Sequence, residues 1–246
     1  MNCYEEFALY YDELMDDVDY KGWFLYIKDI FTRFDVEPKE VLEMACGTGN
    51  LTYYLCKEGY NVTGFDMSEE MLSIAYNKLL HFKNLKLLKQ NMNDFKMSKQ
   101  FDSIVSICDS INYILNKDEL LKIFKNVYEH LKEDGLFIFD INSYYKLSEI
   151  IGDNTFVEDR DDIYYVWQNY FDKASSLAQF NLDFFIKDED GSYMRFDEEH
   201  IERAYQIEEI ESILKEAGFK GIKKYEAFTF NTPKNNSERI NFVAKK

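Results

Sequence analysis

The stretch Val41-Leu42-Glu43-Met44-Ala45-Cys46-Gly47-Thr48-Gly49-Asn50 decides the fold, and Gly64-Phe65-Asp66-Met67-Ser68 follows it closely. The first segment predicts an apolar strand that ends at two glycines and continues into a helix, and the second predicts a strand that ends in a carboxylate. The glycines let the backbone approach a ligand where a Cβ would collide, and the start of the helix points N–H groups at that ligand. Asp66 comes 19 residues after Gly47, close to the roughly 20-residue offset at which a strand-end acid meets ribose hydroxyls. The pattern therefore predicts a nucleoside site.

The third glycine of the dinucleotide fingerprint is missing from this stretch. The pattern G-x-G-x-x-G requires glycine where this chain has Thr52, and that glycine serves close packing of helix and strand around a bound pyrophosphate. A nicotinamide dinucleotide is therefore disfavoured as the ligand.

The residues in front of the glycines agree better with another pattern, an acid followed by small or apolar residues and then Cys-Gly-Thr-Gly. Together with Phe65-Asp66-Met67-Ser68-Glu69-Glu70-Met71-Leu72, this resembles motif I and the second motif of the class I S-adenosylmethionine (SAM) methyltransferases. The layout is similar to the small-molecule type, which includes glycine and nucleotide-amino-sugar N-methyltransferases. Specific motifs cover residues 35–145, and residues 1–34 and 150–246 agree only in layout.

The resemblance implies SAM as the methyl donor, S-adenosylhomocysteine as the product, and a role for individual residues of the predicted nucleoside site. Backbone carbonyls of Ala45 and Cys108 receive the ammonium group of the methionine tail, Asp66 accepts the ribose hydroxyls, and Met67 packs on the base. In the adenine motif Asn91 replaces the usual Asp, and its amide oxygen can still accept a hydrogen bond. The cofactor-binding residues expected from the resemblance are Tyr11, Glu43, Ala45, Cys46, Gly47, Gly49, Asp66, Met67, Asn91, Met92, Asn93 and Cys108.

The N-terminal segment from Tyr4 to Asp12, with Tyr20, resembles the lid of small-molecule methyltransferases, in which a tyrosine closes over SAM. Packing in an amphipathic helix is the alternative for these tyrosines. An arginine that contacts the SAM carboxylate in the amino-sugar enzymes has Val18 and Asp19 as its nearest positions here, so that contact is absent or supplied elsewhere.

The acceptor end carries weaker signals. Tyr11 and His200 are the candidate catalytic residues, and His200 is the histidine best placed to act as a general base. Transfer from a sulfonium is an in-line displacement that alignment and desolvation can accelerate, so a neutral amine acceptor needs no base. The residues that follow the expected strand 102–107 lack the D-P-P-Y or N-P-P-Y motif of amino-methyltransferases that act on nucleic-acid bases. Cys46 and Cys108 are expected to pack beside the ligand rather than act as nucleophiles.

The composition limits the function further. The 246 residues carry 46 acids and 29 bases, a formal charge of −17, which disfavours a nucleic-acid acceptor because such binding is largely cationic. No stretch approaches the roughly 20 apolar residues of a membrane span, and no secretory signal is present, so the cytoplasm is the expected compartment. Cysteines 3, 46, 56 and 108 show no metal spacing, which predicts reduced thiols and no metal.

Alternating strand and helix patterns predict an α/β fold, a doubly wound and mostly parallel seven-stranded sheet. By resemblance its order is 3-2-1-4-5-7-6 with strand 7 antiparallel. The expected strands span 40–45, 61–66, 85–90, 102–107, 135–141, 221–230 and 239–245, and the expected helices span 20–34, 50–58, 69–80, 118–131 and 206–217. Period-two alternation over 155–205 predicts an antiparallel β insertion after strand 5.

This organisation predicts three parts: an N-terminal helical lid (1–34), a SAM-binding domain (35–150 and 206–246), and a β-rich cap (151–205). The expected function is a SAM-dependent methyltransferase acting on a small polar acceptor, with an amine as one candidate. A tRNA- or protein-directed methyltransferase and a non-catalytic SAM-binding regulator stay open as alternatives, as does a homodimer.

Overall fold

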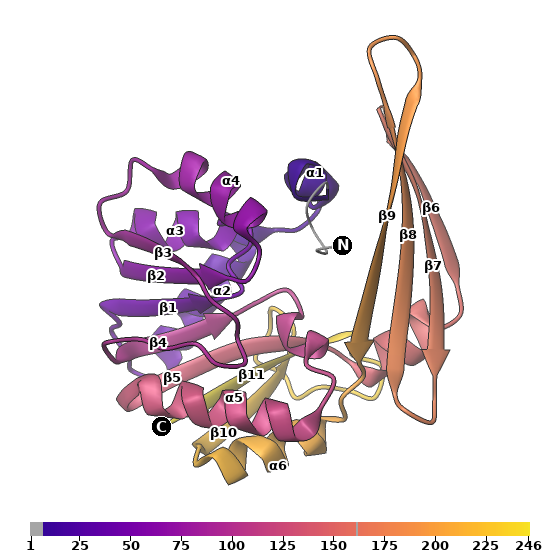
Figure 1. The fold of residues 1–246 in the computed structure, drawn as a ribbon. Coiled ribbons are helices and arrows are strands. Elements are labelled where there is room, and N and C mark those ends of the chain that lie inside the picture. The colour runs from indigo at the N-terminus through magenta and orange to yellow at the C-terminus, as the bar shows by residue number, and fades with distance from the viewer. Residues whose placement is uncertain (1–6, 161) are drawn as a thin grey trace.

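A computed structural model describes residues 7–160 and 162–246 of the chain, which build two β-sheets with helices around the larger one (Figure 1). The larger sheet has the order β3-β2-β1-β4-β5-β11-β10. All its neighbouring pairs are parallel except β5–β11 and β10–β11. This confirms the predicted doubly wound sheet with an antiparallel last strand. Its strands are β1 (Glu40–Met44), β2 (Asn61–Asp66), β3 (Leu85–Lys89), β4 (Phe101–Ser106), β5 (Leu131–Asn142), β10 (Lys220–Glu226) and β11 (Arg239–Lys245).

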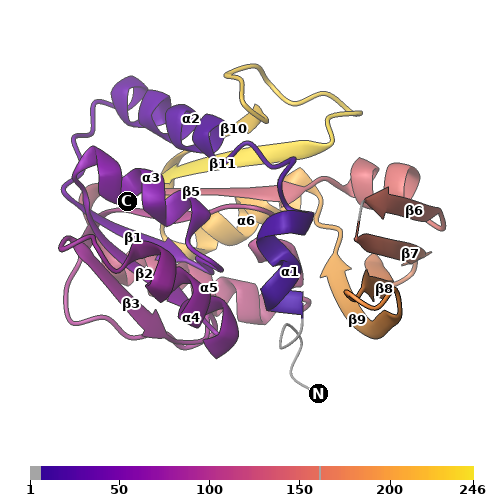
Figure 2. The same cartoon turned by 90° about the horizontal axis from the view of Figure 1, so that it is seen from above.

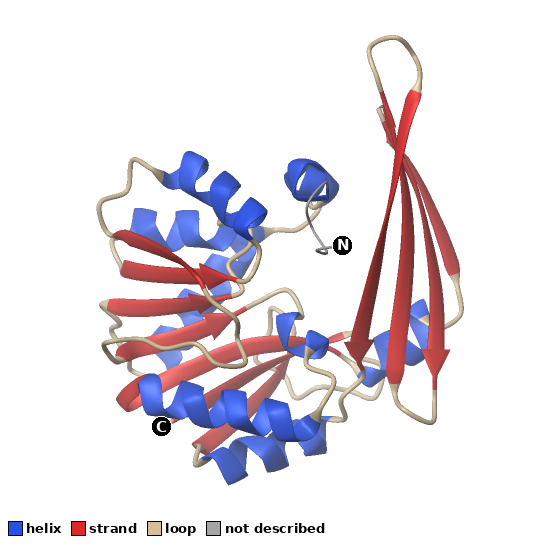
Figure 3. Cartoon of the chain, viewed as in Figure 1, coloured by secondary structure: helices blue, strands red, loops and turns tan. Residues whose placement is uncertain are grey.

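Helices cover both faces of this sheet (Figure 3). Apolar residues of α2 (Tyr20–Arg33) and α3 (Asn50–Glu58) pack on one face, and those of α5 (Lys117–His130) and α6 (Ile207–Ala217) pack on the other. Helix α4 (Glu69–Leu79) follows β2, and α1 (Phe7–Leu14) contacts α4. Burial on both faces explains why β1 and β4 read as nearly continuous apolar runs.

Residues at the helix ends explain where three of these helices begin or stop. The Ser68 hydroxyl accepts a hydrogen bond from the Met71 N–H at the start of α4, and Asn116 accepts from Asp118 and Glu119 at the start of α5. Gly218 ends α6 with a φ of 110°, a left-handed conformation that glycine adopts at little cost. The helices predicted over 118–131 and 206–217 are thus confirmed within one residue at each end.

The inserted segment forms a separate antiparallel sheet of the order β6-β7-β8-β9. Its strands are β6 (Thr155–Arg160), β7 (Ile163–Asp172), β8 (Leu177–Lys187) and β9 (Tyr193–Arg203), and the turn between β8 and β9 closes where Asp188 and Ser192 hydrogen-bond. This cap sheet stands beside the larger sheet, and α1 lies between the two in both views (Figures 1 and 2). The predicted β insertion after strand 5 is confirmed.

Two boundaries differ from the predicted ones. Strand β5 already begins at Leu131, because Leu131 pairs with Phe101 ahead of a register shift. A Cβ on Gly135 would lie 2.9 Å from the Lys132 carbonyl oxygen, so this glycine permits the irregularity within the strand. Strand β10 ends at Glu226 rather than 230, because the next residues turn back through a hydrogen bond from the Thr229 N–H to the Glu226 carbonyl.

None of the helices in the described ranges is long and apolar enough to cross a membrane. The first part of the predicted lid, including Tyr4, and the cysteine at position 3 fall outside the described residues. Two short helices that the sequence did not predict, η1 (Ser110–Tyr113) and η2 (Lys146–Ile151), follow β4 and β5.

Candidate active site

A cavity of about 800 Å³ opens where β1, β2 and β4 end, and its walls include residues of α1 and of the cap sheet. Its size falls within the range of roughly 300–1,000 Å³ found for small-molecule sites. Every predicted cofactor or catalytic residue except Gly49 lines it. The predicted residues on its wall are Tyr11, Glu43, Ala45, Cys46, Gly47, Asp66, Met67, Asn91, Met92, Asn93, Cys108 and His200.

The two glycines of the β1–α3 turn have different roles. Gly47 has a φ of 51°, and a Cβ placed there would meet nothing within 4 Å, so its side toward the cavity is open. Gly49 has a φ of 80°, and its Cβ would lie 2.6 Å from Leu79 Cδ1. Gly49 therefore lets α4 pack against the turn, whereas Gly47 keeps backbone accessible to a ligand.

Asp66 holds this turn from the end of β2. One carboxylate oxygen accepts the Gly47 N–H at 2.8 Å and the other accepts the Ser68 N–H at 2.9 Å. Burial raises the pKa of Asp66, and these backbone N–H groups oppose the rise. Because a carboxylate has about four acceptor positions, Asp66 retains acceptor capacity for a hydroxyl donor.

Left-handed backbone occurs at the ends of two neighbouring strands. Ala45 after β1 has a φ of 52°, and Cys108 and Asp109 after β4 have φ values of 57° and 54°. Such conformations are uncommon outside glycine and concentrate at functional sites. Burial raises the pKa of the Cys46 and Cys108 thiols well above the usual value, which supports packing rather than nucleophilic roles.

The adenine motif follows β3. The Asn91 side-chain oxygen accepts the Asn93 N–H at 2.9 Å, so it shapes this turn as well as lining the cavity. Met92 is buried, while Met67 on the opposite side is 64% exposed. These two methionines lie on the cavity wall as apolar surfaces near the ends of β2 and β3.

Thr52 is the hydrogen-bond partner of Glu43, which the sequence did not reveal. Its side chain is fully buried, and its hydroxyl donates a hydrogen bond to the buried carboxyl group of Glu43. Burial raises the pKa of Glu43 to about 8, against the effect of the Thr52 hydrogen bond. The residue that replaces the third glycine of the dinucleotide pattern is thus the partner of the acid of motif I.

Helix α1 is fixed to the glycine turn through Asp12. Its carboxylate accepts hydrogen bonds from the Thr48 hydroxyl at 2.6 Å and the Asn50 amide at 2.9 Å, and forms an ion pair with Lys78 at 2.6 Å. On the other side, Arg160 of the cap binds Asp16 at 2.9 Å. The lid segment therefore connects the SAM-type motifs to the cap, and Tyr11 lies within it.

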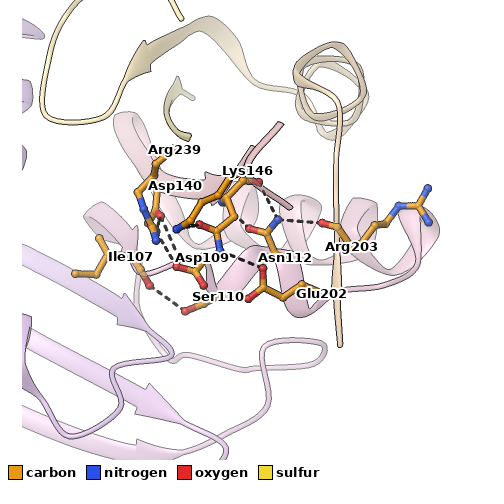
Figure 4. Close-up of polar contacts among 10 residues, drawn as sticks. Ile107, Asp109, Ser110, Asn112, Asp140, Lys146, Glu202, Arg203 and Arg239 are labelled. Atoms are coloured by element: carbon orange, nitrogen blue, oxygen red, sulfur yellow. Dashed lines mark hydrogen bonds and ion pairs between the residues drawn. The ribbon is translucent and has the colours of Figure 1, made fainter. Parts of the chain in front are cut away.

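A buried ionic cluster contributes Asp109, Lys146, Glu202 and Arg239 to the cavity wall (Figure 4). Arg239 from β11 forms ion pairs with Asp109 and Asp140, and the Asp109 N–H also donates to Asp140. Burial works against ionisation of Asp109, but Arg239 and Lys146 hold its pKa below its usual range. Burial raises the pKa of Asp140 to about 6.

Glu202 joins the cap to this cluster. It accepts a hydrogen bond from the Asn142 side chain at 3.1 Å and shares a hydrogen bond with Asp109. Burial, with the charge of Asp109, raises the pKa of Glu202 well above its usual value, so the shared proton belongs to Glu202. The Asn112 side chain also connects the cap to the larger sheet, because it donates to the carbonyl oxygens of Asn142 at 3.1 Å and Arg203 at 2.9 Å.

His200 lies two residues before Glu202 on β9, and its side chain is buried. Its Nδ1 lies 3.4 Å from the Tyr113 hydroxyl of η1. Burial lowers the pKa of His200 to about 4. The imidazole is therefore neutral at physiological pH, as a base or a hydrogen-bonding partner must be.

The sequence did not single out Asp140, Lys146, Glu202 or Arg239. Asp140 had one usable signal, because a carboxylate within the apolar run of β5 requires a partner when buried. That partner comes from β11, 99 residues away, and no local pattern connects the two positions.

Known proteins match the whole chain. Residues 41–135 fit a family model described as a methyltransferase domain. A protein of Geobacillus sp. (strain WCH70), named as a methyltransferase by inference, is 38% identical over 245 residues, which are 99% of each chain. The crystal structure of a SAM-dependent methyltransferase from Clostridium acetobutylicum ATCC 824 is 43% identical, covers 99% of both chains and has a TM-score of 0.89. The chain belongs to the SAM-dependent methyltransferase family.

The methyltransferase is also related to the two groups that its motifs resemble. A glycine/sarcosine N-methyltransferase of Aphanothece halophytica is 26% identical over 219 residues, 85% of this chain and 76% of that protein. A dTDP-amino-sugar N,N-dimethyltransferase of Streptomyces venezuelae is 29% identical over 114 residues, 46% of this chain. These relationships confirm the family predicted from motif I and from the Asp66 segment.

Proposed function

We propose that this methyltransferase transfers a methyl group from SAM to a small polar acceptor, with amines as the favoured class, inside the cavity between lid, sheet and cap. The observation that carries the proposal is the continuity of this one cavity from the glycine turn to the cap. A walled cavity of this kind suits a metabolite better than a macromolecule, and the charge of −17 disfavours a nucleic acid.

The residues present fit SAM. The open side of Gly47 leaves room for the methionine tail, and the remaining acceptor capacity of Asp66 suits a ribose hydroxyl. The backbone carbonyls at Ala45 and Cys108, at neighbouring strand ends, suit the ammonium group. Met67, Met92, Asn91 and Asn93 suit the adenine, with Glu43, Cys46 and Gly49 supporting the turn and Tyr11 covering it.

We assign the lid to the part of residues 1–34 that includes α1, because α2 packs on the larger sheet as part of its core. Residues 35–150 and 206–246 are assigned to the SAM-binding domain, and 151–205 to the cap that selects the acceptor. The separate sheet of the cap supports this division.

When bound, SAM supplies a methyl group activated by an adjacent sulfonium. The chain aligns an acceptor in line with that methyl and excludes water around it, which are large contributions to such displacements. His200 is a neutral imidazole on the cavity wall, and it can accept a hydrogen bond from the acceptor. Its low pKa makes it a weak base, so it is better suited to orienting the acceptor than to removing a proton. A neutral amine requires no such step.

Isothermal titration calorimetry with S-adenosylhomocysteine tests the cofactor site. Asp66→Ala is expected to weaken this binding about 10- to 100-fold, as losing hydrogen bonds to a charged group of about 1.5–3 kcal/mol does. Asp94→Ala, in the exposed turn after β3 and outside the cavity wall, is the matched control. Equal affinities for the wild type and Asp66→Ala would place the ribose contact elsewhere.

Incubation with SAM and a metabolite extract, read by mass for a gain of one methyl, tests the acceptor class. The expected product is a small molecule of low mass. Methylation confined to added tRNA or protein, or SAM binding without any turnover, would overturn the proposal.

A further inference from the structure

We infer that the acceptor carries an anionic group, of the carboxylate class, attached to a planar ring, and that Lys146 binds the anion while cap aromatics hold the ring. The inference rests on the proposed function, because it concerns the acceptor end of the same cavity.

Lys146 is a half-buried cation on the cavity wall, at the start of η2. Its ammonium donates to the Asn142 side-chain oxygen at 3.0 Å, and no carboxylate of a described residue lies within 4.0 Å of it. Arg239, in contrast, contacts both Asp109 and Asp140 directly. An ammonium group has three donors, so Lys146 retains donors for a ligand.

Trp167 lines the cavity on the cap side. Trp167 packs on the apolar cluster that contains Leu147 and Ile151 of η2, so it belongs to the same wall as Lys146.

Aromatic rings form the remaining surface of this wall. Trp167 lies 5.4 Å from Phe156 and 5.7 Å from Phe180 between ring centroids, and Tyr165 lies 5.4 Å from Phe184. All five line the cavity. Rings at these separations prefer offset or edge-to-face partners, so a planar apolar body suits this surface better than an open-chain polar one.

The position of Lys146 indicates the acceptor rather than the nucleoside. It follows β5, whereas the nucleoside motifs follow β1, β2 and β3, which lie on the other side of β4 in the sheet. A carboxylate at Lys146 could also be that of the methionine tail, and the experiment must distinguish these two sources.

Ligand-observed NMR on protein saturated with S-adenosylhomocysteine tests the inference with three matched probes: phenylacetate, phenylacetamide and 2-phenylethylamine. Phenylacetate is expected to bind about tenfold tighter than the amide, since the Lys146 ammonium attracts an ionised carboxylate more strongly than a neutral amide oxygen. Lys146→Met should abolish this preference. Lys83→Met, an exposed lysine away from the cavity, should behave as wild type.

Each other outcome is decisive. Tighter binding of the amine, an unchanged preference in Lys146→Met, or no probe binding to protein that binds S-adenosylhomocysteine normally would overturn the inference while leaving the proposed function intact. Weaker S-adenosylhomocysteine binding by Lys146→Met with unchanged probe preference would reassign Lys146 to the methionine carboxylate. Failure of the wild type to bind S-adenosylhomocysteine would instead count against the proposed function.

Discussion

Thr52 shows how much a single residue contributes to the site. From the sequence it served to exclude a dinucleotide, since glycine is absent where that pattern needs it. In the structure its hydroxyl is the hydrogen-bond partner of the buried Glu43 carboxyl. A buried carboxyl group without a partner costs free energy, so motif I depends on a residue nine positions beyond its acid.

Thr52→Val should therefore destabilise the protein, because valine keeps the shape but removes the donor. The expected loss in free energy of unfolding is about 1–3 kcal/mol, measured by urea denaturation at pH 7. Thr52→Ser keeps a hydroxyl and serves as the control. Equal midpoints for the valine and serine variants would mean that the Glu43 hydrogen bond contributes nothing to stability.

His200 should produce a pH dependence of stability. Its folded pKa, about 4, lies below the ordinary value of 6.5 because burial disfavours the charged ring. Between these values the unfolded chain binds a proton that the folded chain does not, so this contribution to stability falls as the pH drops from about 6.5 towards 4. The difference in free energy of unfolding between wild type and His200→Gln, measured across that range, should shrink as the pH falls. A difference that is constant with pH would contradict the buried neutral ring.

At the scale of elements, α1 and the residues after it connect the larger sheet to the cap sheet. Asp12 ties it to the glycine turn and to Lys78 of α4, and Asp16 ties the residues after it to Arg160 of β6. The sequence indicated a lid through its tyrosines, but the fixing contacts come from aspartates whose partners lie 36 or more residues away.

Asp12→Asn should weaken the attachment of α1 to α4, because the amide cannot form the ion pair with Lys78. Binding of S-adenosylhomocysteine is expected to weaken about three- to tenfold, as for the loss of one partly exposed charged contact. Calorimetry on Asp12→Asn, Lys78→Met and the double variant gives the coupling between the two side chains, with the exposed Glu37→Gln as control. Additive effects would show that the ion pair does not hold the lid.

At the scale of the whole molecule, periodicity predicted the β insertion, and the family resemblance predicted the sheet order. All but one of the residues expected to bind the cofactor line one cavity. These residues follow individual strands, so short motifs could locate them in the chain. The ionic cluster could not be predicted, because Asp109 follows β4, Asp140 lies in β5 and Arg239 lies in β11, and only the pairing of these strands brings the three side chains together.

Arg239→Met should be the most damaging change considered, because it leaves two carboxylates buried without their contacting cation. Removing one partner of a buried ion pair costs about 3–5 kcal/mol, and at this size each 1 kcal/mol lowers the Tm by about 2–4 °C. Differential scanning calorimetry measures the loss. Adding Asp140→Asn to Arg239→Met should recover part of it, and a double variant no more stable than Arg239→Met alone would exclude charge burial as the cause.

The placement of β11 has a consequence for synthesis. This strand lies between β5 and β10 although it follows both in the chain, and it carries Arg239. A ribosome therefore produces Asp109 and Asp140 long before the residue that neutralises them. Until β11 is made, β5 lacks its neighbour on that side, and Asp109 and Asp140 lack the cation that contacts them. The larger sheet and its ionic cluster can therefore be completed only after the cap has been synthesised.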